Sequence, residues 1–109
     1  MEQQVQERLA ALTGRALAPY VSRPAAEDVT VLVDGLITCG RALYNEVVQI
    51  PAGERTVSVA DGLSEWEYCL AAGPRGYGAH ADWNHARGLA RVLQKLARAL
   101  ELHRGMSVL

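Results

Sequence analysis

The chain has 109 residues, half of them hydrophobic, and a formal net charge of -1 at pH 7. This length allows one hydrophobic core and is too short for two, so we expect a single domain over residues 1–109 without a separate catalytic domain. A nearly neutral chain lacks the basic excess that usually accompanies binding to nucleic acids or anionic membranes.

Membrane insertion and secretion find no support in the sequence either. No apolar run approaches the roughly 18 to 20 residues that span a bilayer. The first residues, MEQQ, lack the basic and apolar segments of a signal peptide, so we expect a cytoplasmic protein. Cys39 and Cys69 fall inside expected helices, and in a reducing compartment such cysteines are most often small buried side chains rather than a disulfide.

The first expected helix covers about residues 2–17. It ends before Pro19 because the residue preceding a proline avoids the helical conformation. Gly14 makes it the weakest of the expected helices. The residues on its apolar side are Val5, Leu9, Leu12 and Ala16.

The second expected helix, at about residues 24–49, carries the strongest pattern in the chain. Pro24 suits a first turn, and the two acidic residues after it are favoured near the positive end of the helix dipole. The β-branched run at 29–33 is also compatible with a strand. The apolar residues, however, keep a three-then-four spacing for four further turns without a turn signal, which favours a helix.

Two further helices are expected, at about residues 58–72 and 82–103. Ser58 followed by Asp61 resembles a capping arrangement for the third helix, and Gly73-Pro74 ends it. A glycine-rich loop then leads to Asp82, whose charge suits the start of the fourth helix. Four helices with short loops predict an all-α four-helix bundle of mostly antiparallel neighbours, in which the second and fourth helices form the main contact.

Several of these segments are similar to those of a known family. They are the long helix ending at Ile50-Pro51, the turn ADGLSE at 60–65, the Gly/Pro loop from Leu70 to Gly78, and HARGLAR at 85–91 with Ala99-Leu100 beyond it. From about Glu27 to His103 the chain resembles small actinobacterial proteins, mostly from Streptomyces, that carry a domain of unknown function and are described as "natural product biosynthesis protein". The chain departs from them at Trp66 and Tyr68, where the family tends to carry smaller or basic residues. The resemblance implies a place near secondary metabolism and names no reaction or catalytic residue.

The segment from His80 to His85 contains three potential metal ligands, the two histidines and Asp82. Imidazole and carboxylate groups suit zinc or iron. Two histidines five residues apart do not share a helical face, however, and Asp82 is explained as a charge at a helix N-terminus. The Glu-x-x-His pairs of a di-iron bundle do not occur in the sequence. We therefore expect no metal site, no catalytic residue set and no cofactor.

The expected place for a small-molecule site is the loop at 73–78 together with the space between the neighbouring helices. The two tryptophans of this region also fall on inward-facing stripes, so filling of the core explains them without a ligand. The candidate residues are Trp66, Tyr68, Arg75, Tyr77, Trp83 and His85.

A basic stripe follows the fourth expected helix. Its members, at spacings of four, four and three, are Arg87, Arg91, Lys95 and Arg98. Such a stripe can bind phosphates, although positive charges on the solvent-facing side of an amphipathic helix are common and need no ligand. The eight acidic residues between Glu27 and Glu67 offer counter-charges within the chain. No aromatic residues interleave to stack bases, which argues against nucleic-acid binding.

These observations favour a non-catalytic accessory or regulatory protein-interaction module, and the resemblance implies an association with secondary metabolism. We also expect a homodimer or a complex with a pathway partner, because the face of the fourth helix that includes Val92, Ala99 and Leu102 has no obvious partner within the chain. A small-molecule-binding protein or minor enzyme with an interhelical pocket is the alternative. A DNA-binding regulator that uses the basic stripe is a weaker one.

Overall fold

The computed structural model describes residues 3–22 and 24–108, and all regular structure within them is helical. The helices are α1 (Gln3–Ala16), α2 (Ala26–Val48), α3 (Val57–Ala72) and α4 (Ala79–Val108). Two single 3-10 turns, η1 (Tyr20–Ser22) and η2 (Ala52–Glu54), lie in the first two connections. The predicted all-α four-helix bundle is confirmed, and residues 29–33 lie inside α2 rather than in a strand.

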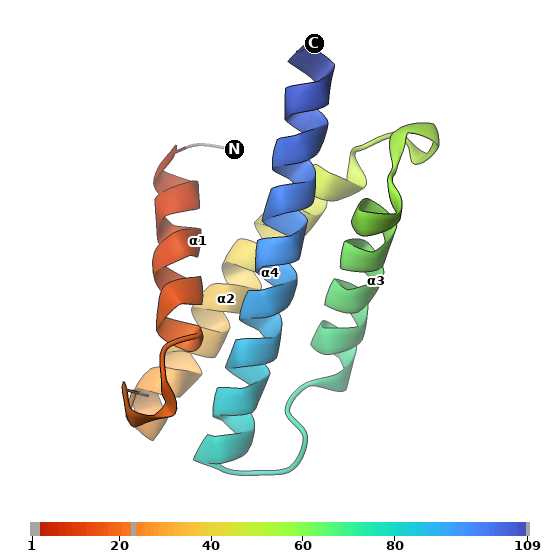
Figure 1. The fold of residues 1–109 in the computed structure, drawn as a ribbon. Helices are drawn as coiled ribbons and strands as arrows, with labels where there is room; N and C mark the ends of the chain where they lie inside the picture. The colour runs from red at the N-terminus through yellow and green to blue at the C-terminus, as the bar shows by residue number, and fades with distance from the viewer. Residues whose placement is uncertain (1–2, 23, 109) are drawn as a thin grey trace.

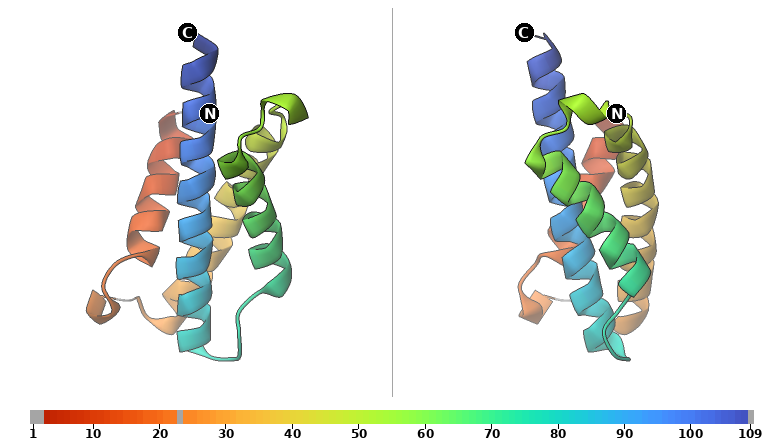
Figure 2. Two further views of the ribbon diagram at one scale, coloured as in Figure 1. Left: turned by 45° about the vertical axis from the view of Figure 1, so that its right-hand side comes forward. Right: turned by 90° about the vertical axis from the view of Figure 1, so that its right-hand side faces the viewer.

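The four helices run alternately in opposite directions (Figure 1). α2 and α4 therefore run in the same direction, and they form the most extensive contact, as predicted. α1 and α3 pack on opposite sides of this central pair, and their described residues do not contact each other. The last turns of α4 extend beyond the other helices (Figure 2). At about 1.5 Å per residue, the 30 residues of α4 account for the 45 Å long axis of the molecule.

The core lies between α2 and α4, with α1 and α3 closing it on either side. Its fully buried leucines recur three, four or seven positions apart, so they form one continuous apolar side on each helix. Burial of each such side chain contributes about 1.5–3 kcal/mol. These leucines are Leu32, Leu36 and Leu43 in α2 and Leu89, Leu93 and Leu96 in α4.

α1 contributes Leu9, Leu12 and Ala16 to the core, as its apolar pattern predicts. The side chain of Val5, which completes that pattern, and the predicted helix start at residue 2 lie outside the described residues. Thr13 is buried as well, and its hydroxyl donates a hydrogen bond to the carbonyl oxygen of Ala10 at 3.1 Å. The polar group is thereby satisfied within its own helix.

Two helices have boundaries that differ from the prediction by two or more residues. α2 begins at Ala26 rather than at residue 24, because Ala25 keeps an extended backbone with φ −61° and ψ 159°. α4 covers 79–108 rather than 82–103. At its start, the carbonyl oxygen of Gly78 accepts the amide of Asp82 at 3.1 Å, so the first turn precedes Asp82. At its end, Gly105 does not stop the helix, since a helical glycine costs only about 1 kcal/mol.

The cap of α3 also differs from the prediction. Thr56, not Ser58, is the N-cap, and its hydroxyl accepts the Val59 backbone N–H at 3.2 Å. The chain enters the helix at Val57, so Ser58 already lies in the first turn. The other end of α3 is as predicted, because Gly73 follows it with a φ of 63°, a conformation that favours glycine.

α2 and α3 approach closely where the indole of Trp66 packs against Gly40. A β-carbon at position 40 would lie 2.1 Å from Cη2 of the indole. The contact at Gly62 of α3 is less tight, because a β-carbon there would lie 3.0 Å from a methyl carbon of Leu96. Glycine at these positions therefore sets how closely α3 approaches the central pair.

Candidate interaction face between α3 and α4

A groove of about 540 Å³ lies on the surface between α3 and α4. The residues on each wall are one, three or four positions apart, so they lie on one side of their helix. Val92 is buried and Cys69 half-buried, and they form an apolar floor. The residues that line this α3–α4 groove are Ser64, Glu65, Tyr68, Cys69, Arg91, Val92 and Lys95.

The groove holds one paired and one unpaired cation. Nζ of Lys95 lies 2.9 Å from Oε2 of Glu65, and both side chains are about half exposed. The hydrogen bond to Glu65 raises the pKa of Lys95, so the ammonium stays charged. Arg91, one turn earlier in α4, forms no ion pair with the residues that the structure describes. The groove therefore presents an unneutralised guanidinium beside apolar side chains.

Cys69 contributes to the apolar floor of the groove, and its thiol is not activated. Burial raises the pKa of its thiol, and the nearby Glu65 carboxylate raises it further. A thiol with a raised pKa is mostly protonated at neutral pH and is therefore a weak nucleophile. Cys39 is also a free thiol, and it is buried in the core.

Three of the six predicted site residues lie in α3 or on its connection to α4, and one of them, Tyr68, lines the groove. Tyr68 is 62 % exposed, and Nη2 of Arg75 donates a hydrogen bond to its hydroxyl oxygen at 3.4 Å. Tyr77 is fully exposed on the connection. Gly76 and Gly78 flank Tyr77 with φ angles of 93° and 92°, so this turn requires glycine at both positions. We call the groove, together with Arg75 and Tyr77, the α3–α4 face.

The other three predicted site residues lie elsewhere. Trp66 and Trp83 are each only 2 % exposed, which confirms that the two tryptophans fill the core. Trp83 lies in the first turns of α4, beside Val29 at the start of α2. His85 is half-buried, and burial lowers the pKa of its imidazole while Asp82 partly opposes that shift. The structure thus does not gather the six residues around one cavity.

The predicted basic stripe is divided between the two sides of α4. Steps of four residues advance about 40° around a helix, so the stripe turns from α1 towards α3. Arg87 faces α1, and Lys95 faces α3, where it pairs with Glu65. Arg98 lines a separate groove along α1. Of the four stripe residues, Arg91 and Arg98 have neither an ion pair nor a side-chain hydrogen bond among the described residues, whereas Arg87 binds carbonyl oxygens and Lys95 binds Glu65.

Two arginines cap helix ends, a role that the sequence analysis missed. Nη1 of Arg87 donates to the carbonyl oxygens of Ala16 and Ala18, at 3.2 and 3.0 Å, and the guanidinium lies 5.7 Å from the centre of a Trp83 ring. Arg55 donates to the carbonyl oxygens of Val48 and Ile50 at 2.9 and 3.0 Å. The last carbonyls of a helix lack partners within it and attract cations. Arg55 could have been found by its position just after α2, whereas Arg87 is distant in sequence from α1.

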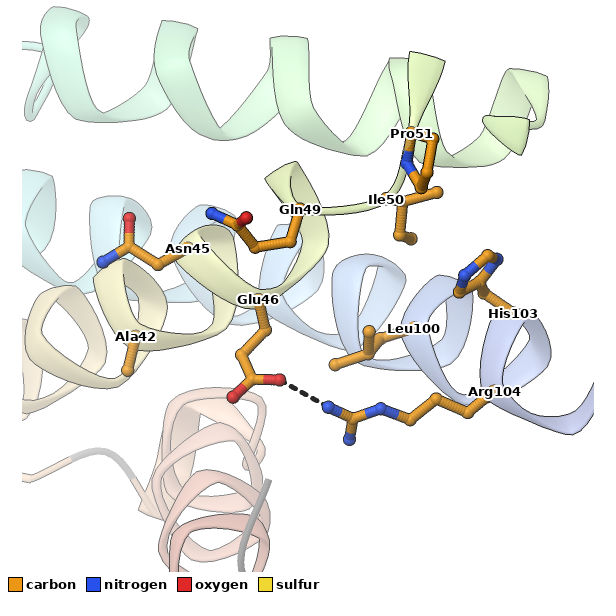
Figure 3. Close-up of a pocket in the computed structure, with 9 residues that line it drawn as sticks. All are labelled: Ala42, Asn45, Glu46, Gln49, Ile50, Pro51, Leu100, His103 and Arg104. Carbon is orange, nitrogen blue, oxygen red and sulfur yellow. Dashed lines mark hydrogen bonds and ion pairs between the residues drawn. The ribbon is translucent and has the colours of Figure 1, made fainter. Parts of the chain in front are cut away.

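A second hollow, of about 530 Å³, lies where the end of α2 meets the last turns of α4 (Figure 3). Ala42, Ile50 and Leu100 form its apolar part. Glu46 and Arg104 form an ion pair across it, so these two charges neutralise each other within the chain. This hollow therefore lacks the unpaired charge that distinguishes the α3–α4 groove.

The face of α4 that was expected to lack a partner is mostly covered within the chain. Val92 and Ala99 are buried, so the prediction was wrong for both residues. The reason is that α3 packs along this side of α4, with Val59 and Ala99 lining the same depression. Leu102, which is 54 % exposed, is the remaining member of that set.

The described part of the chain contains neither a cluster of metal-ligating side chains nor a membrane-spanning helix. No group of three or more His, Cys, Asp or Glu side chains is placed there to hold a metal ion. None of the four α-helices there combines the length and the apolar character needed to cross a bilayer.

Comparison with known families gives one match. The profile of DUF6415, a family of unknown function, matches residues 7–105. The matched region includes α2 and α3 completely and most of α1 and α4. Neither curated proteins nor solved structures give a match.

Proposed function

We propose a function for this chain, which belongs to the DUF6415 family of unknown function. The chain is a non-catalytic accessory or regulatory module that binds a partner protein through the α3–α4 face. We further propose that it acts in the cytoplasm of an actinobacterium and in secondary metabolism. The support for the actinobacterial origin and for secondary metabolism is the resemblance of residues 27–103 to Streptomyces proteins described as natural product biosynthesis proteins.

The composition of the α3–α4 face carries the proposal. Tyr68 and Arg91 line a groove with an apolar floor, Arg75 donates a hydrogen bond to Tyr68, and Tyr77 is fully exposed on the connection between α3 and α4. Tyrosine and arginine are enriched at protein interfaces and supply many of the residues that dominate binding energy. A tyrosine ring also offers a large contact area at a low cost in conformational entropy.

The partner is tested first as a second copy of the chain and then as another protein. Light scattering on a size-exclusion column, over the micromolar range, reports whether the chain forms the expected homodimer. Affinity capture from the native host reports other proteins. Tyr77→Ala and Arg91→Ala should weaken whichever association occurs, because both side chains are exposed on the α3–α4 face.

Val31→Ala is the matched control. Val31 is a 68 % exposed apolar residue on α2, outside the α3–α4 face, so its removal tests the general effect of losing exposed apolar surface. Association that is lost in the two face variants and kept in Val31→Ala supports the proposal. The proposal is ruled out if the chain is a monomer and every protein that it captures still binds after Tyr77→Ala and Arg91→Ala.

A further inference from the structure

We infer that the α3–α4 groove binds an acidic amphipathic helix of a partner protein. Apolar side chains of that helix lie over Val92 and Cys69, and a carboxylate lies beside Arg91. The inference rests on the proposed function, and it adds the kind of segment that the partner presents.

The shape of the groove suits a helix. Its walls are two neighbouring antiparallel helices, so a third helix laid between them repeats the packing of the bundle itself. Each wall offers residues one turn apart, Ser64 and Tyr68 on α3 and Arg91 and Lys95 on α4. Helices that bind in grooves insert apolar residues at i, i+3 or i+4, and i+7, which matches this one-turn spacing.

The charges select an acidic partner segment over a nucleic acid. Glu65 neutralises Lys95, which leaves the Arg91 guanidinium as the unpaired charge of the groove among the described residues. Asp61, one turn before Glu65 on α3, adds a further negative charge to this wall and also acts electrostatically on Lys95. A continuous polyanion would therefore be repelled from the α3 side. A helix that carries carboxylates only along its α4 side satisfies both walls, and such complementarity fixes the orientation of binding.

The experiment uses the full chain and a lactam-bridged helical peptide as the probe. The peptide carries leucines at i, i+3 and i+7 and glutamates along one flank of that stripe, and binding is followed by fluorescence anisotropy. We expect binding that Arg91→Glu weakens by roughly tenfold or more, because a charge attraction becomes a repulsion. A peptide with lysine in place of the glutamates should recover affinity for the Arg91→Glu chain.

The control for charge is Arg41→Glu, which makes the same reversal at an exposed position of α2 outside the groove. A second variant, Ser64→Trp, fills the groove from its exposed wall without altering the charge. Circular dichroism verifies that each variant is folded. Cys69 gives an independent readout, because a bound helix should slow its alkylation by iodoacetamide, while the buried Cys39 reports any unfolding.

The outcomes separate this inference from the proposed function. Peptide binding that is lost in Ser64→Trp, kept in Arg41→Glu and rescued by the charge swap supports the inference. No peptide binding, or binding unaffected by Arg91→Glu and Ser64→Trp, overturns it, and the proposed function still stands if partner capture depends on Tyr77. A homodimer that Ser64→Trp dissociates assigns the groove to a second copy and also overturns the inference.

Discussion

Gly40 should respond to alanine in the opposite way from an ordinary glycine in a helix. Replacing a helical glycine by alanine usually stabilises a protein by about 0.5–1 kcal/mol, because the unfolded chain loses conformational freedom. At Gly40 the new β-carbon would lie 2.1, 2.5 and 2.7 Å from three indole carbons of Trp66. Carbon atoms in contact lie about 3.5–4.0 Å apart, so the ring would have to move by more than about 1 Å.

The ring has little space for that movement. Trp66 is only 2 % exposed, and an indole is rigid, so we take the upper end of the overpacking range, about 3 kcal/mol. The gain from alanine offsets about 1 kcal/mol of this cost. Gly40→Ala should therefore destabilise the fold by about 2 kcal/mol, which corresponds to a fall of roughly 8 °C in Tm for a chain of this size.

Gly14→Ala is the matched control, since a β-carbon there meets nothing within 4 Å. It should stabilise the fold by about 0.5–1 kcal/mol. Urea and thermal unfolding followed by circular dichroism measure both variants. In a Trp66→Leu background the penalty of Gly40→Ala should largely disappear, because the clashing ring is gone. A Gly40→Ala chain as stable as the Gly14→Ala chain, or a penalty that persists without Trp66, would contradict the predicted clash.

Three further predictions concern single side chains. Arg87→Ala should cost about 1–2 kcal/mol in urea unfolding because two carbonyl oxygens at the end of α1 lose their donor, whereas Arg91→Ala should stay within about 0.5 kcal/mol. Thr56→Ala should cost about 1 kcal/mol through loss of the α3 cap; a larger loss from Ser58→Ala would contradict that assignment. Burial lowers the pKa of His85, so in mild acid the folded chain binds fewer protons than the unfolded chain. Protonation of His85 therefore favours the unfolded chain, and the free energy of unfolding should fall as pH falls through about 6.5 and below. NMR titration of His85 checks the shift, and unfolding of His85→Gln should show a weaker decline in acid.

Local sequence patterns were sufficient to predict the helices and which side of each is apolar. The spacing of Leu32, Leu36 and Leu43 predicted the inward side of α2, and Gly73 predicted the end of α3. These signals act within a few residues, because helical periodicity and the φ angle of a glycine depend on neighbouring backbone. The first residue of each helix was harder to predict. Thr56 and Ser58 can both cap a helix, and the sequence alone does not show at which of them the chain enters α3.

The tertiary structure decided what covers each apolar side and which charges remain unpaired. The pattern of α4 could not reveal that α3 covers Val92 and Ala99, because periodicity defines an apolar side without naming its neighbour. For the same reason Arg87 was predicted as part of a solvent-facing stripe, although its partners are carbonyl oxygens of α1. Such pairings join residues that only packing brings together. The candidate site follows from them, since Arg91 stands out only once its neighbours in the stripe have found partners.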